Sequence, residues 1–304
     1  MSILDFIIWS PNPEIFPGIS WLPVRWYGLL FAIAFIVGQQ IYFLIYKKEN
    51  KPEKDVETLT IYLIVATLIG ARLGHVIFYE PFRYLSNPLE ILQIWKGGLA
   101  SHGASIGILL GIYIYSNYFI KITFSEFKIT KRKKEGQSFL YVMDRIVIVA
   151  ALGGAFIRTG NFVNSEIIGK PTYNSSGILF AWDAIERFEY DQIIDEARVE
   201  KNNKSGTSDN YNGYKPVDLI LTFSEDVDQE RMVRQYVEIH VKRILTTYDY
   251  AALHIYEEPG EIIKYSISQS PEGAYVANIS TLGIPRYPAQ LYEAFSSFLL
   301  FLLL

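Results

Sequence analysis

The sequence predicts an all-α polytopic membrane protein, a bundle of transmembrane helices with an α+β insert outside the membrane. Near-uncharged apolar runs of about 20 residues recur along the chain, which is the length that crosses a hydrocarbon core of roughly 30 Å. Short clusters of Lys and Arg separate these runs. One long stretch, 171–285, holds 19 acidic and 10 basic side chains, while the rest of the chain holds 13 acidic and 18 basic ones. A soluble chain of this composition, 50% hydrophobic and 20% charged, would interleave polar and apolar residues more finely.

Five apolar runs are expected to be spans. Four of them lie near residues 22–46, 58–79, 99–120 and 139–157, and with their connections they form a predicted membrane body over residues 1–170. The fifth lies in the segment 281–304, whose residues are still apolar at Leu304. We therefore expect this last segment to be the start of a further, truncated transmembrane helix.

Two basic clusters predict the orientation of these spans. The first span is followed by "KKENKPEK", with four lysines, and the third by "KITFSEFKITKRKKEG", with six basic residues in sixteen. Loops rich in Lys and Arg near span ends face the cytoplasm. The N-terminus, the loop near 80–96 and the acidic insert are then predicted to lie outside.

The insert, residues 171–280, has the composition of an α+β unit. Strands are expected in "VDLILTF" and "YSISQ", and a flexible loop in "EKNNKSGTSDNYNGY". The segment "DQERMVRQYVEIHVKRIL" predicts a helix with one apolar face, which takes in most of the residues Met232, Val233, Tyr236, Ile239, Val241 and Leu245. His240 and His254 have no partners at metal-ligand spacing and are interpreted as surface or packing residues. With no cysteine in the chain, we expect no disulfide and no thiolate metal site. The polar residues also show no metal cluster, so no metal and no cofactor are expected, and nothing in the charge pattern indicates a nucleic-acid partner.

Polar side chains within or beside the spans are predicted to meet at one level, the outer leaflet. Charged groups inside a membrane segment are costly and commonly line a site. The groups in question are Arg25 to Gly28, Arg72 with His75, His102, Arg158 with Asn161 and Asn164, and Arg286 with Gln290, Tyr292 and Glu293. The opposing interpretation is that such arginines only extend to lipid phosphates and that His102 is a hydrogen-bonded residue at a helix start. We prefer that interpretation for Arg25 and Trp26 alone.

Several arginines at this level suit a phosphate, because guanidinium is a permanently charged bidentate donor, and a histidine can take a proton near neutral pH. The pattern therefore predicts an enzyme that binds a phospholipid by its phosphate and activates a nucleophile from a second substrate. The alternative is a non-enzymatic protein that binds or transports phospholipids. An intramembrane protease is disfavoured, since neither a serine elbow nor paired intramembrane aspartates occur.

Five ordered motifs, "RWYGLLF", "GARLGHVIFY", "GGLASHGASIG", "RTGNFVNSEIIG" and "PRYPAQLYEA", closely resemble those of the bacterial prolipoprotein diacylglyceryl transferases. The resemblance covers roughly residues 20–170 and 283–304. It implies transfer of the diacylglyceryl group of phosphatidylglycerol to the lipobox cysteine thiol in a prolipoprotein signal peptide, with release of glycerol 1-phosphate. It also implies a multi-pass protein of the bacterial inner (cytoplasmic) membrane, with its N-terminus outside and its site at the outer leaflet.

Taken together, the resemblance and the polar level give a set of expected site residues. The expected catalytic residues are His102, Arg158 and Tyr27, and the expected substrate-binding residues are Arg72, Asn161, Asn164, Glu166, Gly169, Arg286 and Glu293. His102 is expected to help deprotonate the thiol while Arg158, with Arg72 or Arg286, holds the phosphate. Three departures from the family pattern stand out: Ser165 replaces a glycine, the insert is longer than usual, and the family pattern continues past the fifth span with a Tyr and Arg motif.

Overall fold

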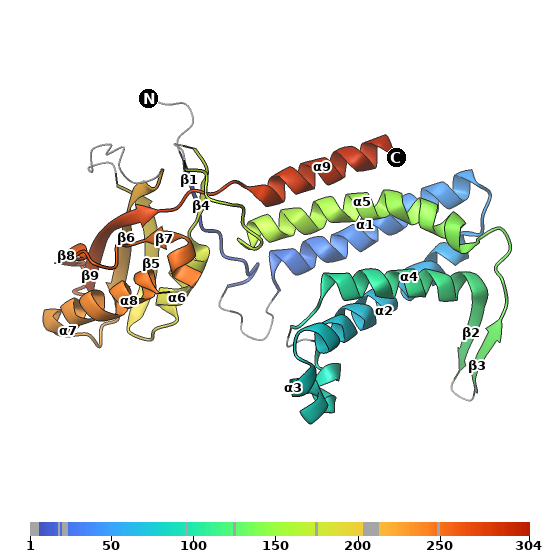
Figure 1. Ribbon diagram of the computed structural model, residues 1–304, viewed down its shortest axis with the longest axis horizontal. Helices are drawn as coiled ribbons and strands as arrows, with labels where there is room; N and C mark the ends of the chain where they lie inside the picture. The colour runs from blue at the N-terminus through green and yellow to red at the C-terminus, as the bar shows by residue number, and fades with distance from the viewer. Residues whose placement is uncertain are drawn as a thin grey trace. The chain divides into compact units, whose positions relative to one another are not determined.

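The computed structural model describes residues 6–17, 19, 24–94, 97–123, 126–173, 176–202, 213–247 and 250–304. The chain divides into two compact units, Met1–Leu30 with Ile157–Ser296 and Phe31–Phe156 with Ser297–Leu304. Figure 1 gives the order of the elements along the chain. The predicted division at residues 170 and 280 stays a prediction, because the units are defined by packing and not by position in a membrane.

The helices of the membrane part begin and end close to the predicted spans. They are α1 (Trp26–Lys48), α2 (Glu53–Phe78), α4 (Ser101–Asn117), α5 (Phe139–Val163) and α9 (Ala289–Leu303). Among the described residues, α1, α2 and α5 are long and apolar enough to cross a membrane. Helices α4 and α9 have 17 and 15 residues, shorter than the about 20 that a span needs. The three long apolar helices agree with the predicted membrane character, but the count of five spans is not confirmed.

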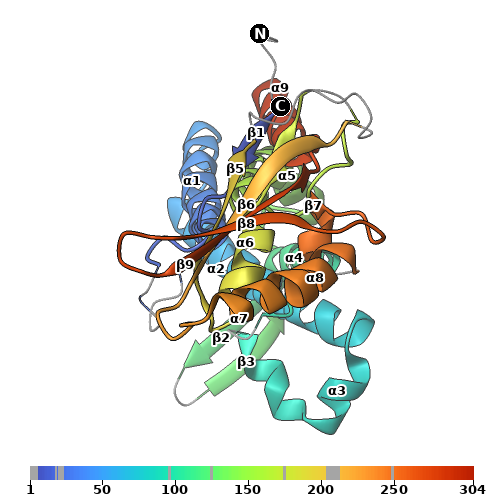
Figure 2. The same cartoon turned by 90° about the vertical axis from the view of Figure 1, so that its left-hand side faces the viewer.

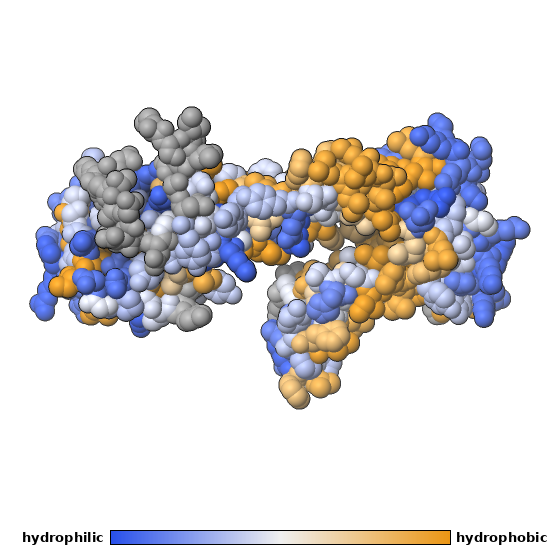
Figure 3. Space-filling view, turned by 45° about the horizontal axis from the view of Figure 1, so that its top comes forward, coloured by the Kyte–Doolittle hydropathy of each residue, from blue (hydrophilic) through white to orange (hydrophobic). Residues whose placement is uncertain are grey.

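Apolar side chains cover the outside of the helices in the second unit (Figure 3). Exposed examples on α1, α2 and α4 are Ile36, Leu44, Ile61, Ile69, Ile77, Ile106 and Leu110. In water such a surface would be unfavourable, so its natural surroundings are lipid tails.

Glycines bring α2 and α4 into backbone contact. A Cβ atom built on Gly70 would lie 2.4 Å from the carbonyl oxygen of Gly103, and one on Gly107 would lie 2.2 Å from that of Ala66. Spacings of four residues, Gly70 with Gly74 and Gly103 with Gly107 and Gly111, place these positions on one face of each helix. The glycines around His102 therefore allow close packing of two helices.

A buried polar network ties together the basic ends of the helices. Gln137 accepts hydrogen bonds from the hydroxyls of Tyr46 (2.9 Å) and Tyr115 (2.6 Å), and its amide donates to Asp55 Oδ2 at 2.5 Å. Lys134 Nζ pairs with Asp55 Oδ1 at 2.7 Å. Next to this network, β2 (Tyr118–Thr123) and β3 (Glu126–Lys131) form an antiparallel hairpin. The sequence predicts only a basic loop there.

Two short helical segments connect α2 to α4. They are α3 (Pro81–Ser86) and the 3₁₀ helix η1 (Pro88–Leu92), both of which begin with proline. Proline suits the first position of a helix, because its fixed φ fits the helix and its missing N–H would have no helical partner there.

The first unit contains an antiparallel sheet with helices on one face (Figure 2). The strand order is β5 (Ile194–Lys201), β6 (Lys215–Phe223), β9 (Tyr275–Gly283) and β7 (Ile255–Tyr256), with β8 (Lys264–Gln269) also pairing with β9. Its helices are α6 (Trp182–Glu189), α7 (Glu230–Gln235), α8 (Lys242–Thr246) and the 3₁₀ helix η4 (Tyr250–Leu253). The core includes Leu219, Leu221 and Phe223 of β6, whose alternation is typical of a strand with one buried face.

Both predicted strands and the predicted helix of the insert are present. The helix, however, contains a π-helical turn, η3 (Tyr236–Val241), between α7 and α8. Because a π turn takes in an extra residue, the buried face shifts to include Val237 and Ile244. The predicted face is right for Val233, Tyr236, Val241 and Leu245 and wrong for Met232 and Ile239, which are exposed. The predicted flexible loop lies mostly at 203–212, outside the described residues.

The N-terminal segment joins the insert through a short parallel pair of strands. Strand β1 (Ile7–Trp9) pairs with β4 (Ile178–Phe180), about 170 residues later in the sequence. The Trp9 indole donates a hydrogen bond to the Phe162 carbonyl at 3.1 Å, and their rings lie 4.5 Å apart. This contact secures the last turn of α5, which carries Asn161 and leads directly to Asn164 and Glu166.

Candidate active site

The end of α5 folds back on itself in a Schellman motif. The N–H of Ser165 donates to the Phe162 carbonyl at 3.1 Å, and the N–H of Glu166 donates to the Asn161 carbonyl at 2.8 Å. Ser165 adopts φ = +58°, the left-handed conformation that this motif requires and that glycine prefers. The reversal returns Glu166 to the last turn of the helix, beside Asn161.

The Glu166 carboxylate organises two asparagines. Its Oε2 accepts a hydrogen bond from Asn161 Nδ2 at 3.1 Å, and its Oε1 accepts one from Asn164 Nδ2 at 3.2 Å. From α9, Gln290 Nε2 donates to the Glu166 backbone carbonyl at 2.7 Å. Asn161, Asn164 and Gln290 are all buried, so this network fixes their orientation.

Arg158, one helical turn before Asn161, faces the same network. Its Nε lies 2.5 Å from Glu293 Oε2, and its Nη1 donates to Asn161 Oδ1 at 3.3 Å. The side chain is 33% exposed, and within the described residues its Nη2 has no partner. Two neighbours therefore hold Arg158 in place, while its Nη2 stays available to donate to an anion.

Two glycines allow other parts of the chain to approach this network. A Cβ on Gly160 would lie 3.1 Å from the Cα of Tyr27, so α1 and α5 pack closely there. A Cβ on Gly169 would lie only 2.2 Å from the Tyr287 carbonyl oxygen. Gly169 is thus required by the close passage of the chain before α9, whereas the Tyr27 ring packs beside the end of α5.

Arg286 uses its side chain to hold backbone carbonyls. Its Nη1 donates to the Gly169 carbonyl at 3.1 Å, while Nε and Nη2 donate to the Leu253 carbonyl at 3.2 and 2.6 Å. Burial lowers the pKa of Arg286 from its ordinary value, and the nearby Tyr214 and Tyr173 act in the opposite direction.

Arg72, in the second unit, is likewise occupied by carbonyl groups. It is 4% exposed, and its three nitrogens donate to the carbonyls of Glu90, Ile91, Gln93, Gly97 and Gly98. Its guanidinium also lies 4.8 Å from the centre of the Tyr84 ring. In this conformation Arg72 organises the segment between α2 and α4.

His102 lies in the first turn of α4 and is exposed. Its ring is near those of Phe78 (5.1 Å) and Tyr79 (5.7 Å), which end α2. The His75 ring also stacks on the Tyr79 ring, with 5.4 Å between ring centres, and its Nε2 lies 3.7 Å from Glu80 Oε2.

The structure thus places the expected site residues in two groups, one in each unit. The first unit holds Tyr27, Arg158, Asn161, Asn164, Glu166, Gly169, Arg286 and Glu293, and the second holds Arg72 and His102. Two residues outside the expected site set also contribute: Gln290, which the sequence places only in the outer polar level, orients Glu166, and Trp9 secures Phe162. Gln290 is detectable as an amide at the start of an apolar helix, whereas Trp9 acts on a partner 153 residues away and has no local signal.

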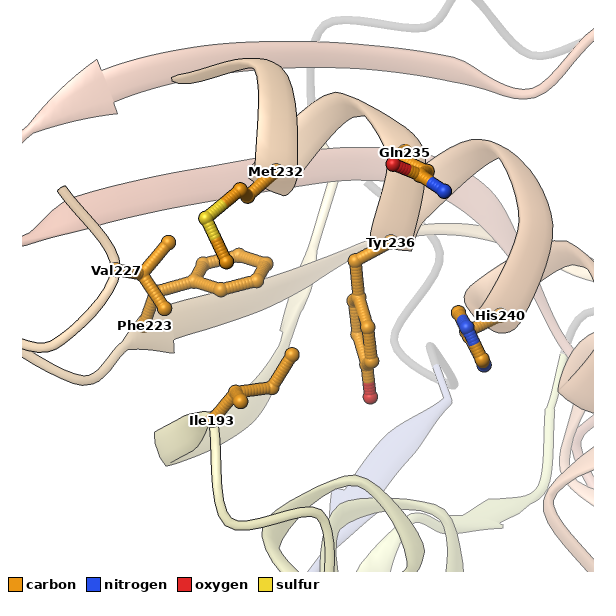
Figure 4. A pocket seen from close by; sticks show the side chains of 7 residues that line it. All are labelled: Ile193, Phe223, Val227, Met232, Gln235, Tyr236 and His240. Atoms are coloured by element: carbon orange, nitrogen blue, oxygen red, sulfur yellow. The ribbon is translucent and has the colours of Figure 1, made fainter. Parts of the chain in front are cut away.

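The insert contains a separate apolar pocket that shares none of these residues (Figure 4). It is lined by Ile193, Phe223, Val227, Met232, Gln235, Tyr236 and His240. His240 stacks on Tyr236 with 5.4 Å between ring centres, and the buried His254 lies 3.3 Å from Asp183 Oδ2. These are the surface and packing environments expected for the two histidines. Among the described residues, no group of three or more His, Asp or Glu side chains could hold a metal ion.

Comparison with known proteins identifies the family of the chain. Residues 14–304 match the family described as prolipoprotein diacylglyceryl transferase. The chain is similar to phosphatidylglycerol--prolipoprotein diacylglyceryl transferases from Chloroherpeton thalassium (42% identity over 60% of this chain and 62% of that protein) and Tolumonas auensis (41%, over 57% and 61%). It is also similar to the enzyme of that name from Porphyromonas gingivalis (40%, over 64% and 62%). The chain therefore spans about three fifths of the length of these relatives. With a family match over nearly all of its residues, the chain belongs to the prolipoprotein diacylglyceryl transferase family.

Proposed function

We propose that this protein transfers the diacylglyceryl group of phosphatidylglycerol to the lipobox cysteine of a prolipoprotein signal peptide. The observation that carries the proposal is the state of Arg158, which two side chains hold while, among the described residues, its Nη2 has no partner. A phosphate oxygen is an anionic acceptor that this nitrogen suits, because guanidinium is permanently charged and its N–H groups form strong hydrogen bonds to phosphate.

Of the three arginines considered for the phosphate, Arg158 suits the role best. Arg72 and Arg286 donate to backbone carbonyls, so binding a phosphate would require them to give up those bonds. Arg158 instead binds Glu293 and the orienting Asn161, and both leave its Nη2 available. The Asn161–Glu166–Asn164 network then sets the direction in which Arg158 points.

The reaction requires one bond to form and one to break. The cysteine sulfur attacks the glycerol carbon that bears the phosphate ester, forming the C–S thioether bond. The C–O bond to the phosphate breaks, its electron pair stays on the phosphate oxygen, and glycerol 1-phosphate leaves. Arg158 stabilises the charge on this leaving group. A thiol has a pKa of about 8.5, so a base must take its proton near neutral pH, and we assign this task to His102.

The proposed setting is the bacterial inner membrane, with the N-terminus outside and the site at the outer leaflet. The two basic clusters that follow the first and third predicted spans support this orientation. The lipid donor and the signal peptide would then both reach the site from the membrane and its outer surface.

The proposal is tested with the full-length protein in phosphatidylglycerol liposomes and a cysteine-containing lipobox peptide. Arg158→Ala is expected to lower transfer by about 10²-fold or more, since removing one preorganised donor costs that much in comparable sites. The matched control is Arg132→Ala, in the basic segment after β3. Near-normal transfer by Arg158→Ala would refute the role in binding the phosphate. For His102, Gln keeps a hydrogen-bonding side chain but is not a base, so full activity of His102→Gln would refute the proposed proton transfer.

A further inference from the structure

The insert is joined to the end of α5 by a collar of backbone hydrogen bonds, formed by residues 169–172, 178 and 284–287. The N–H of Thr172 donates to the Pro285 carbonyl at 2.9 Å, and the N–H of Tyr287 donates to the Lys170 carbonyl at 3.0 Å. Arg286 and Ile178 exchange two backbone hydrogen bonds of 2.8 and 2.9 Å. Residues 167–169 connect the Schellman turn, which includes Glu166, to this collar, so the position of this loop depends on both.

Arg286 links this collar to the body of the insert. Its guanidinium reaches the Gly169 carbonyl on one side and the Leu253 carbonyl, at the end of η4, on the other. The N–H of Ile284 donates to the neighbouring His254 carbonyl at 2.8 Å, which adds a second bond to the same corner of the insert. The planar fork of an arginine can hold two carbonyls at a fixed separation, which a single ammonium group cannot do.

We propose that the insert positions the Glu166–Gly169 loop through Arg286, so that Arg286 is a positioning residue and not a phosphate ligand. The insert then serves as a rigid support for the network that orients Arg158. Gly169 lies directly against Tyr287, where a Cβ would be only 2.2 Å from the Tyr287 carbonyl oxygen. A displacement of the Gly169 carbonyl, which Arg286 holds, would therefore also shift the loop that leads back to Glu166. The catalytic part of this inference rests on the proposed transfer reaction.

The link itself is tested by hydrogen–deuterium exchange of the full-length protein in detergent, without phospholipid. Arg286→Ala is expected to speed exchange of the Thr172 and Tyr287 amides by roughly tenfold, because bonds that each contribute about 1 kcal/mol hold the collar closed. Arg286→Lys should give an intermediate rate. The control Arg231→Ala, exposed on α7, should leave these amides unchanged. Unchanged exchange in Arg286→Ala would overturn the proposal.

The consequence for the reaction is tested with the liposome assay. Displacing a catalytic group by about 1 Å can cost 10²-fold in rate, so Arg286→Ala is expected to lower kcat by 10- to 100-fold. The KM for phosphatidylglycerol should change by less than about twofold, since no phosphate contact is lost. A large rise in KM with unchanged exchange would make Arg286 a phosphate ligand, and unchanged kcat would refute the positioning role. Lack of transfer by the unaltered protein would refute the proposed function, while the exchange result would still decide whether Arg286 holds the loop.

Discussion

Replacing Gly107 with alanine tests the backbone contact between α2 and α4. The new methyl group would lie 2.2 Å from the Ala66 carbonyl oxygen and 3.0 Å from the Gly70 Cα. The first distance is 0.8 Å shorter than the 3.0 Å below which real Cβ contacts essentially do not occur, and the obstructing atom is backbone. The helices must therefore separate, and overpacking of this kind costs about 1–3 kcal/mol. Small residues at helix interfaces are what permits such close packing in membranes.

The assay is an SDS unfolding titration in mixed micelles, followed by circular dichroism. Gly107→Ala should lower the free energy of unfolding by about 2 kcal/mol. The matched control is Gly153→Ala on α5, where a Cβ would meet nothing within 4 Å. Because alanine has a higher helix propensity than glycine, this change should leave the free energy of unfolding unchanged or raise it by up to about 1 kcal/mol. If Gly107→Ala proved as stable as Gly153→Ala, the close α2–α4 contact would be refuted.

Three further substitutions test other parts of the structure. Ser165→Gly should raise the thermal unfolding temperature, because a non-glycine residue at φ = +58° costs about 1 kcal/mol; a lower temperature would contradict the Schellman turn. Arg72→Lys should destabilise the protein by about 3 kcal/mol in the SDS titration, since buried carbonyls lose their donors, and unchanged stability would contradict the carbonyl cage. Burial raises the pKa of Glu257 above its ordinary 4.5, although the Thr281 hydroxyl bonded to it acts in the opposite direction. The protonated form is favoured in the fold, so stability is lost as pH rises through the raised pKa. Glu257→Gln should therefore unfold at a higher temperature than the unaltered protein at neutral pH but not at about pH 4, and equal temperatures at both pH values would contradict the burial.

Local sequence signals predict the helices and the insert strands well. The apolar runs place α1, α2 and α5, and the strand-like composition of "VDLILTF" places β6. The extent of α5 differs from the prediction, since it continues through Arg158 and Asn161 to Val163. Polar residues there end the apolar run, but their side chains bond to one another and leave the helix intact.

Features that depend on distant partners were not predictable from the sequence. Strand β1 exists because Ile7–Trp9 meets Ile178–Phe180. The π turn at Tyr236–Val241 changes which side chains are buried, and no period in the sequence indicates it. The residue types at the site were predictable, but their tasks were not: an intramembrane arginine looks the same in sequence whether it faces a phosphate or, like Arg72, a set of carbonyls.

The most direct test of the central claim is the identity of the product formed by the full-length protein. Phosphatidylglycerol labelled in its acyl chains and the lipobox peptide should give a peptide carrying an intact diacylglyceryl group on cysteine, with an equal amount of glycerol 1-phosphate. Tandem mass spectrometry should locate the group on sulfur, and neutral hydroxylamine, which cleaves thioesters but not oxygen esters, should leave the whole diacylglyceryl group in place. A hydroxylamine-labile acyl group on the cysteine, or phosphatidylglycerol binding with no modified peptide, would contradict the account.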